Sequence, residues 1–555
     1  KSYEIYCVSS LVLKKDMEVL TTDFAQTNFH SPLIRSYLKG ELDSSLFTAH
    51  PSLEAFRAQR QTKLDSYPSS NRSVLVTALK EQYAKLNLNA PAVDENIQKL
   101  TDQYTFTVCT GHQLNLFTGP LFFIYKILHT VKLSQTLNEH FDDMHCVPVY
   151  WMASEDHDSA EIDHLHINKV KLKWNTDQTG AVGDFETNEL DAVISLIREL
   201  LPNTSEASQL VALFTRAYRK GSVLADATQT LVHELFKQYG LIVLNPQSRA
   251  LKSLFKPIIE RELLHSFSKK AVDDTSIHLR NMGFSTQVNG REINLFFVDK
   301  HSRQRIVRDG EDFLLADTKR RFTREEMQRI LDEAPEHFSP NVVLRPIYQE
   351  CILPNLAYIG GGGELSYALQ LKAAFDAVSV PFPLFILRHS LFWATAKDRS
   401  KMNALGAQMI DFTTSKDATI NGAIRRVSDI DIDFSPQRAL LTEQFVALKD
   451  IALKTDKSFL GAVLAQEKKQ IKGLDTLEKR LLKAQRRKLA DQVQRISEIY
   501  DHFYPMGVPH ERFENFSALY AQMGDAFFDR ILSAFSADLG HGQLLLLELP
   551  EGVKG

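Results

Sequence analysis

Cysteine is scarce in this sequence. The chain has 555 residues and 4 cysteines, none of which is part of a CxxC pair. The four are Cys7, Cys109, Cys146 and Cys351. This spacing argues against a disulfide framework and is typical of free thiols in a reducing compartment. Because Cys109 and Cys351 lie in or beside strand-like runs, we expect both to be packed in the core.

Long apolar runs and a strong net charge are also missing. No stretch of 18 apolar residues exists, so we expect no membrane-spanning helix and no membrane partner. The first ten residues, KSYEIYCVSS, lack the apolar core of a signal peptide, which favours the cytoplasm. The formal net charge is −4, so we expect no nucleic-acid partner. A site for an anionic ligand must therefore be built locally.

The chain length predicts two or three domains. Strand-like apolar runs alternate with helical segments, at residues 104–109, 147–153, 240–246, 292–299, 356–360 and 383–387. This alternation of strands and helices is typical of an α/β fold with a parallel sheet. We predict a core in residues 1–390, with a helical insertion at about 168–235 and a second insertion at about 270–340. An α-helical coiled-coil domain, 391–503, and a C-terminal segment that returns to the core, 504–555, complete the chain.

The coiled-coil prediction depends on apolar residues repeated in steps of three, four and seven. They are Ile471, Leu474, Leu481, Leu482, Leu489, Val493, Ile496, Tyr500 and Phe503. TDKS, residues 455–458, is a plausible turn between this helix and a preceding antiparallel one, 440–454. The long helix is also very basic, at Lys468, Lys469, Lys472, Lys479, Arg480, Lys483, Arg486, Arg487 and Lys488. We favour a solvated face over a nucleic-acid-binding arm.

The loop TGHQLNLFTGP, residues 110–120, joins a strand to a long amphipathic helix. Thr118 or Gly119 can cap that helix and Pro120 suits its first position. Free amides at the helix start would attract a carboxylate or phosphate, and Lys126 could add a positive charge. At the strand end, the candidate ligand-binding residues are Gly111, His112 and Gln113. A capped turn with a surface histidine remains an equal alternative.

A second candidate is SEDHDSAEIDHLH, residues 154–166, which follows the apolar strand VPVYWMA. Open α/β sheets bind ligands at such carboxyl ends. Crowded carboxylates can orient a histidine, bind a divalent metal or simply form a solvated acidic loop. No spacing matches a zinc signature such as HExxH, so we expect no metal ligands. We favour an acid/base cluster of Glu155, Asp156, His157 and Asp158, with His157 as its first candidate.

A third strand end carries YIGGGGELSYALQ, residues 358–370. Glycines there allow close backbone approach to a ligand, although a tight turn is nearly as good an interpretation. The spacing is neither GxGxxG nor a P-loop. The candidate residues are Gly361, Gly362 and Glu364, with Asn245, Arg345 and Arg388 as lesser ones near other strand ends. Three polar loops at one sheet edge predict an active site for an anionic substrate.

Four blocks resemble one known family. TGHQLNLFTGPLFFIYK resembles TGQQ-x-x-L-x-TGPL-x-x-x-x-K, and PVYWMASEDHDSAEIDH resembles P-V-[FY]-W-x-A-x-EDHD-x-x-E-[IV]-[DN]-H. YIGGGGELSYALQLKAAF and YPMGVPHERFEN resemble [YV]-[IV]-GGPGE-[IL]-x-Y-x-x-x-L and YP-x-G-x-x-QER-x-x-N. The family is that of the bacillithiol biosynthesis cysteine-adding enzymes. The match runs from about residue 104 to the C-terminus.

The resemblance implies a Rossmann-like core similar to class I aminoacyl-tRNA synthetases, with connecting-peptide insertions and a coiled coil that supports a homodimer. It implies a ligase that joins the carboxyl of L-cysteine to the amine of glucosaminyl-malate. ATP is the expected activator and Mg²⁺ a candidate companion, because a carboxylate and an amine do not condense readily in water. His112 stands where the family usually has Gln, Gly362 stands where it often has Pro, and clean HIGH and KMSKS motifs are absent.

The implied roles are as follows. Helix-start amides near Gly119, with Lys126, would stabilise phosphate charge. His157 or Glu155 would take a proton from the attacking ammonium. Arg345 or Arg388 would hold the malate carboxylates. The alternatives are a metal-dependent hydrolase built on the EDHD cluster and a non-enzymatic coiled-coil scaffold.

Overall fold

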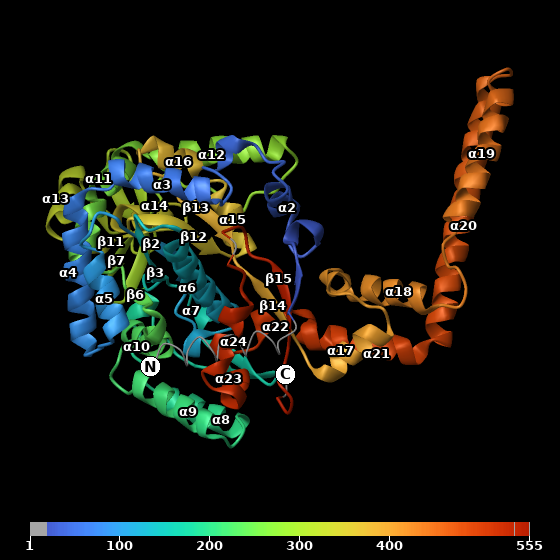
Figure 1. Ribbon diagram of the computed structural model, residues 1–555. Coiled ribbons are helices and arrows are strands. Elements are labelled where there is room, and N and C mark those ends of the chain that lie inside the picture. The colour runs from blue at the N-terminus through green and yellow to red at the C-terminus, as the bar shows by residue number, and fades with distance from the viewer. Residues whose placement is uncertain (1–18, 538, 554–555) are drawn as a thin grey trace. The chain divides into compact units, whose positions relative to one another are not determined.

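The computed structural model describes residues 19–537 and 539–553 (Figure 1). Cys7 and the N-terminal segment considered for targeting lie outside these residues. Contacts divide the chain into two units. The core unit holds the described residues up to Phe392 together with Val508–Leu547, and the helical unit holds Trp393–Gly507 and Glu548–Glu551. None of the helices in the described ranges is long and apolar enough to cross a membrane.

A five-stranded parallel sheet forms the centre of the core unit and confirms the predicted α/β class. Its order is β13-β12-β2-β3-β6, and each neighbouring pair runs parallel. The strands are β2 (Thr105–His112), β3 (His145–Met152), β6 (Ile242–Leu244), β12 (Asn355–Gly360) and β13 (Leu384–Leu387). All five are almost entirely buried, which explains why they read as continuous apolar runs. Because β2 lies between β3 and β12, the loops that follow these three strands meet at one edge.

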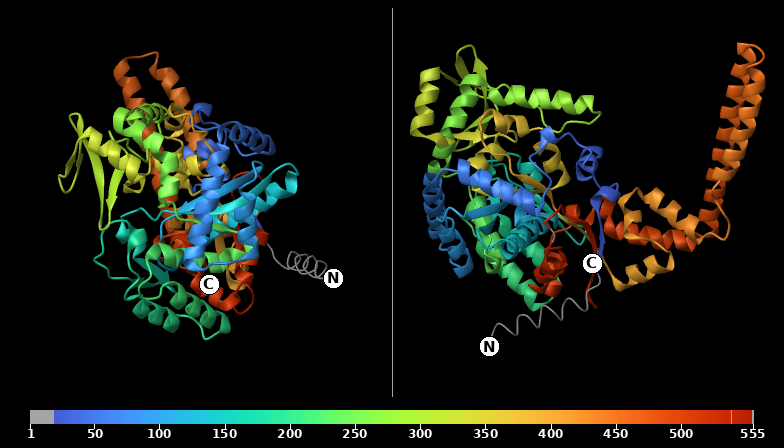
Figure 2. Two further views of the ribbon diagram at one scale, coloured as in Figure 1. Left: turned by 90° about the vertical axis from the view of Figure 1, so that its left-hand side faces the viewer. Right: turned by 45° about the horizontal axis from the view of Figure 1, so that its top comes forward.

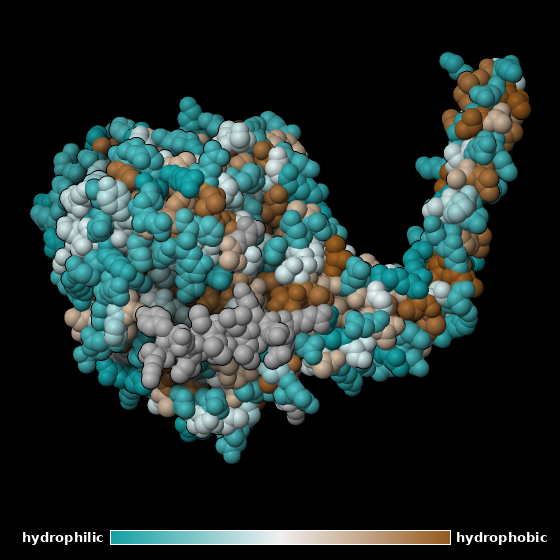
Figure 3. Space-filling view, in the orientation of Figure 1, coloured by the Kyte–Doolittle hydropathy of each residue, from teal (hydrophilic) through white to brown (hydrophobic). Residues whose placement is uncertain are grey.

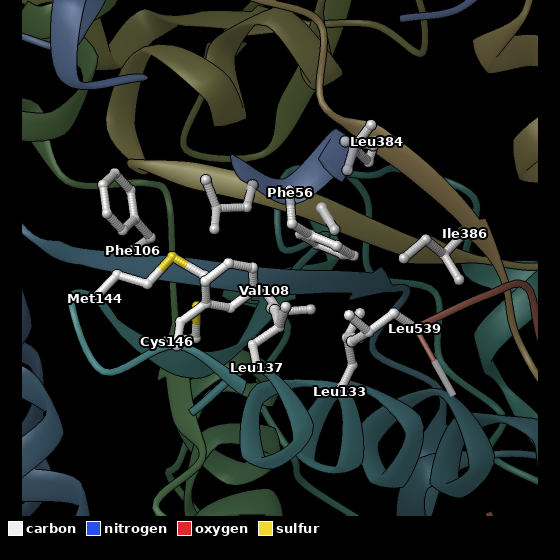
Figure 4. Close-up of a cluster of buried hydrophobic side chains, with 14 of the residues drawn as sticks. Phe56, Phe106, Val108, Leu133, Leu137, Met144, Cys146, Leu384, Ile386 and Leu539 are labelled. Atoms are coloured by element: carbon white, nitrogen blue, oxygen red, sulfur yellow. The ribbon is translucent and has the colours of Figure 1, made fainter. Parts of the chain in front are cut away.

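Two helices pack against this sheet and share one buried cluster. α6 (Phe122–His140) packs against β2 and β3, and α3 (Leu53–Ser66) packs against β12 and β13. Leu133 and Leu137 point from α6 toward the strands, where Val108 lies, and Phe56 of α3 belongs to the same buried cluster (Figure 4). Full burial of side chains of this size contributes roughly 1.5–3 kcal/mol each. This cluster therefore fixes the sheet under the loops at its edge. Cys109 is buried as expected, whereas Cys351 is only partly buried.

The first insertion contains a short hairpin and three helices. The hairpin pairs β4 (His164–Ile167) with β5 (Val170–Lys173), and the helices are α8 (Leu190–Leu200), α9 (Ser205–Ala217) and α10 (Leu224–Phe236). α7 (Ser159–Ile162) precedes the hairpin, directly after the EDHD residues.

A second, antiparallel sheet follows β6 along the chain. α11 (Arg249–His265) and α12 (Phe267–Asn281) lead into strands arranged β10-β9-β8-β7-β11, which Figure 2 shows in yellow-green at the edge of the core unit. They are β7 (Leu295–Asp299), β8 (Ser302–Asp309), β9 (Asp312–Leu315), β10 (Arg321–Phe322) and β11 (Phe338–Pro340). The run at 292–299 therefore contains a strand, as predicted, but our assignment of this strand to the parallel sheet is wrong. α13 (Arg324–Glu333) and α14 (Arg345–Ile352) return the chain to β12.

The remaining elements of the core unit surround the sheet. They are α2 (Pro32–Leu38), α4 (Ser69–Leu86), α5 (Pro91–Lys99), α15 (Gly362–Ala368), α16 (Lys372–Ala377), α22 (His510–Phe513), α23 (Ser517–Met523) and α24 (Ala526–Ala534). β15 (Leu544–Glu548) pairs antiparallel with β1 (Val19–Thr22), so the C-terminal apolar run is a strand as predicted. β14 (Ser390–Ala394) completes this small sheet.

The helical unit contains a long antiparallel hairpin. α19 (Ser435–Ala452) and α20 (Lys457–Lys488) pack through Phe445, Ala452 and Val463. α17 (Ala396–Ala404), α18 (Lys416–Val427) and α21 (Ala490–Phe503) form the rest of the unit. The single helix predicted up to residue 503 is wrong, because Leu489, with φ −103° and ψ 39°, separates α20 from α21. Apolar side chains remain exposed along the hairpin, as the brown patches of Figure 3 show, among them Leu440, Val446, Ile451, Leu453, Phe459, Leu464 and Leu477.

Candidate active site

A cavity of about 750 Å³ opens at the carboxyl ends of the parallel strands. Its wall includes residues from the loops that follow β2, β3 and β12, as the sequence predicted for the three polar strand ends. Six Arg or Lys residues and three Asp or Glu residues line it. The basic residues are Lys126, Arg291, Arg303, Arg345, Arg388 and Arg512, and the acidic ones are Glu155, Asp156 and Glu364. Cationic excess in a partly enclosed cavity favours an anionic ligand.

Four of these charged residues form three ion pairs, two of them with residues outside the wall. Lys126 Nζ lies 2.8 Å from Glu364, and Arg388 Nη2 lies 2.7 Å from Glu511. Lys252 Nζ, from α11, lies 2.5 Å from Glu155 Oε1. In each pair at least one side chain is nearly inaccessible to solvent. Pairing in this setting fixes the side chains and neutralises both charges.

The Lys126–Glu364 pair joins the loop after β12 to α6. Lys126 also donates to the carbonyl of Gly111, and Glu364 accepts from Tyr358 Oη at 2.7 Å and from the Gly361 amide at 2.9 Å. Burial alone would raise the pKa of Glu364, but the Lys126 charge and these donors lower it to about 2. Burial lowers the pKa of Lys126, with Glu364 opposing that shift. Lys126 therefore holds two strand ends together.

The loop before α6 has a strained backbone. Phe117, Thr118 and Gly119 have φ values of 50°, 73° and 65°. A Cβ at Gly119 would also lie 2.5 Å from Asn115 Cβ, so this position requires glycine. Asn515 lies in the C-terminal PHERFEN block, residues 509–515. It donates to the carbonyls of Phe117 and Gly119 and holds this conformation.

The expected cap of α6 is wrong. α6 begins at Phe122 without a side-chain cap, and neither Thr118 nor Gly119 lines the cavity. The Leu121 amide, at the start of this helix, donates to the Glu514 carbonyl at 2.8 Å and is therefore not free for a ligand. The tertiary contact with the PHERFEN block replaces the local capping rule here.

The EDHD residues occupy different environments. Glu155 is paired with Lys252, and Asp158 does not line the cavity. Asp156 accepts from Gln113 Nε2 at 3.0 Å and from the His157 amide at 2.8 Å. Burial raises the pKa of Asp156, but hydrogen bonding to His157 and Gln113, followed by the Arg303 charge, outweighs burial and lowers it. Among residues 19–537 and 539–553, no group of three or more His, Cys, Asp or Glu side chains is placed to hold a metal ion.

His157 lines the cavity and contacts an arginine. Its Nδ1 lies 2.8 Å from Arg303 Nη1, and its ring lies 5.4 Å from the ring of Phe296. No motif in the sequence marks Arg303, because it comes from β8 of the antiparallel sheet.

Four arginines of the cavity wall are different from Arg388. In the described part of the chain, no carboxylate oxygen lies within 4.0 Å of Arg291, Arg303, Arg345 or Arg512. Arg345 Cζ lies 5.5 Å from the Tyr358 ring, and its Nη1 donates to Gln349 Oε1 at 3.2 Å. Arg512 Cζ lies 5.7 Å from the Phe122 ring. Guanidinium groups that lack a carboxylate partner are suited to bind one from a ligand, or a phosphate.

The other predicted residues divide between the cavity and the scaffold. Gly361 lines the cavity, but Gly362 packs against His30, whose Nδ1 would lie 2.6 Å from an added Cβ. Asn245 lies outside the cavity wall, where its Oδ1 accepts from Ser154 Oγ at 2.7 Å. His112 lines the cavity, and burial, followed by the Lys126 charge, lowers its pKa to about 3. It is therefore a neutral side chain.

Sequence reasoning missed four residues of this arrangement, which are Lys252, Arg303, Glu511 and Arg512. Glu511 and Arg512 lie in the PHERFEN block, so that motif contained a signal we did not use. Lys252 and Arg303 have no local signal, since each reaches the site from an element far from the motifs.

Comparisons with known proteins address the identity of the chain. Residues 17–389 match "Bacillithiol biosynthesis BshC, N-terminal Rossmann-like domain", and residues 393–546 match "Bacillithiol biosynthesis BshC, C-terminal coiled-coil domain". These matches confirm the predicted Rossmann-like core and coiled coil.

Individual relatives of this chain indicate the same family. A protein of Christiangramia forsetii named "Putative cysteine ligase BshC" is 43% identical over 515 residues, covering 92% of this chain and 95% of the relative. One of the same name from Flavobacterium johnsoniae is 41% identical, covering 92% and 96%. A solved structure titled as a putative arginyl-tRNA synthetase from Campylobacter jejuni covers 80% of this chain and 95% of that one at 10% identity. Its TM-score of 0.21 supports no conclusion. The domain matches and the two relatives place this chain in the bacillithiol biosynthesis BshC family.

Proposed function

We propose that this chain is a ligase that joins the carboxyl of L-cysteine to the amine of glucosaminyl-malate, with ATP as the source of activation. The observation that carries the proposal is the cavity, in whose wall four arginines have no carboxylate oxygen of the described residues within 4.0 Å. Malate contributes two carboxylates, cysteine one, and ATP a triphosphate, so every reactant carries at least one anionic group. The printed names of the relatives, which call them cysteine ligases, support the same reaction.

The cavity has the size and chemistry to hold these reactants. Small-molecule sites commonly enclose about 300–1,000 Å³, and this one encloses about 750 Å³. Backbone at Gly361 and Gly363 faces the cavity, and a Cβ at Gly363 would meet nothing within 4 Å, so a ligand can approach the chain there. When bound, ATP would activate the cysteine carboxylate, and Mg²⁺ could accompany its phosphates.

The roles assigned from the sequence need to be redistributed among the arginines. Arg388 is bidentate with Glu511, so its charge is already matched. Arg345 and Arg512 are better placed to hold carboxylates or phosphates. Glu155 is a poor proton acceptor because Lys252 holds it. We therefore assign Glu155, Lys126 and Glu364 to the support of the cavity, and Arg345 and Arg512 to ligand binding.

The first test is direct. The purified protein is incubated with L-cysteine, glucosaminyl-malate and Mg-ATP, and the amide product is sought by mass spectrometry. We expect product only when ATP is present, and none when glucosamine without malate replaces the acceptor. Product without ATP would refute the activation step, and a folded protein with no product under any condition would refute the ligase assignment.

We also propose a cytoplasmic homodimer formed through the α19–α20 hairpin. Leu440 and Leu477 are 62% and 53% exposed and line one groove of that hairpin. Exposed apolar side chains of this size are typical of an interface. Replacing both by Lys should convert a dimer into a monomer in light scattering, whereas Lys468→Glu, on the basic face, should not. A wild-type monomer at micromolar concentration would contradict the proposal.

A further inference from the structure

The guanidinium of Arg303 is held on several sides. Its Nε donates to Ser339 Oγ at 3.2 Å and its Nη2 to the Pro340 carbonyl at 3.3 Å, both on β11. Its Cζ lies 3.8 Å from the centroid of the Phe296 ring on β7, in cation–π contact. The remaining nitrogen, Nη1, faces His157 Nδ1 at 2.8 Å. The antiparallel sheet therefore presents one N–H of Arg303 to the histidine in a defined direction.

This contact determines where the histidine carries its proton. A guanidinium has donors and no acceptor, and it stays protonated in proteins. His157 Nδ1 must therefore accept, and the neutral ring then carries its hydrogen on Nε2. Asp156 is the other charged group facing this nitrogen, but its Oδ1 is 3.5 Å away and already accepts from the His157 amide. Glu155, the next acidic neighbour, is matched by Lys252.

We infer that His157 serves the ligation as a hydrogen-bond donor through Nε2–H, with Arg303 as the positioning residue that fixes this tautomer. The inference rests on the proposed function for the reaction itself. Negative charge grows on the carboxyl oxygen when an amine attacks an activated carboxyl group, and a fixed neutral donor stabilises that charge. The histidine expected from the sequence to take a proton thus has its Nδ1 lone pair committed and its other nitrogen protonated.

The tautomer can be measured without substrate. In protein labelled with ring-¹⁵N histidine, the His157 signals are assigned by their loss in His157→Gln. We expect Nδ1 to be the unprotonated nitrogen in the wild type and in Arg303→Lys, which keeps a donor. Arg303→Met should shift the ring toward the Nδ1–H form, and Arg305→Met, on the same strand but outside the cavity wall, should leave it unchanged. An Nδ1–H ring in the wild type would overturn the inference, even if ligation were never observed.

Kinetics distinguish a donor from a base. Gln keeps an N–H donor but cannot accept the proton of an ammonium, so His157→Gln should retain at least about 10-fold more kcat than His157→Ala. Loss of a donor to a developing oxyanion commonly lowers kcat by roughly 10²–10³-fold. Arg303→Met should reduce kcat in the wild type and much less in the His157→Gln background, since the pair acts as a unit. Equal losses in His157→Gln and His157→Ala would show that proton acceptance is needed and would refute the donor role.

Discussion

Replacing Arg345 by Met should remove most of the ligation activity while leaving the fold intact. Arg345 is at the start of α14, lines the cavity and is held by Gln349 Oε1 at 3.2 Å, with no carboxylate oxygen of the described chain within 4.0 Å. Loss of a charge-assisted contact to an anionic ligand costs about 2–4 kcal/mol, which corresponds to roughly 30- to 900-fold in kcat/KM. The kcat/KM of Arg345→Lys should lie between those of the wild type and Arg345→Met, because lysine keeps the charge but lacks the planar guanidinium.

The matched comparison is Arg388→Met. Arg388 lines the same cavity, but its removal leaves Glu511, whose side chain is 2% exposed, without its ion-pair partner. We therefore expect Arg388→Met to lower Tm strongly, and Arg345→Met to leave Tm within about 2 °C of the wild type. We would measure kcat/KM by steady-state kinetics and Tm by thermal unfolding for both variants. A kcat/KM for Arg345→Met within threefold of the wild type would exclude Arg345 from ligand binding.

The location of the site could be predicted from the sequence, but its electrostatics could not. Buried parallel strands are apolar throughout, so polar residues after 104–109, 147–153 and 356–360 mark their ends. Ion pairs have no such local signature, because they join elements distant in the chain. The sequence predicted Arg388 as a ligand-binding residue, but Arg388 is paired with Glu511. It predicted Glu155 as a base, but Glu155 is paired with Lys252.

The errors in secondary structure have the same origin. Local rules placed a cap at Thr118, but Asn515 and the Glu514 carbonyl determine the start of α6 instead. Apolar periodicity predicted one helix through Leu489, where no Gly or Pro signals a break. The strand β7 was recognised from its composition, yet its pairing with β8 and β11 depends on contacts that periodicity does not contain.

Lys252→Met should destabilise the protein more than most single changes. Lys252 is 0% exposed and the Glu155 side chain 11%, and Lys252 also donates to the Phe338 carbonyl at 2.8 Å. Removing one member of such a pair leaves a buried charge and costs about 3–5 kcal/mol, whereas replacing both members by apolar residues of similar volume is often neutral. Burial lowers the pKa of Lys252 and Glu155 opposes that shift. We expect a clear fall in Tm for Lys252→Met and partial recovery in Lys252→Met/Glu155→Leu.

A second buried ion pair, Lys63–Glu350, serves as a control for an effect on stability alone. Lys63 Nζ lies 2.6 Å from Glu350 Oε2, with side chains 1% and 0% exposed, and neither residue lines the cavity. Lys63→Met should cost similar stability but leave kcat of the folded protein unchanged. Lys252→Met should lower both Tm and kcat, because Glu155 directly precedes Asp156 and His157. If Glu155 were instead the proton acceptor, Glu155→Gln would abolish kcat at an unchanged Tm, and the assignment of this pair to the scaffold would be wrong.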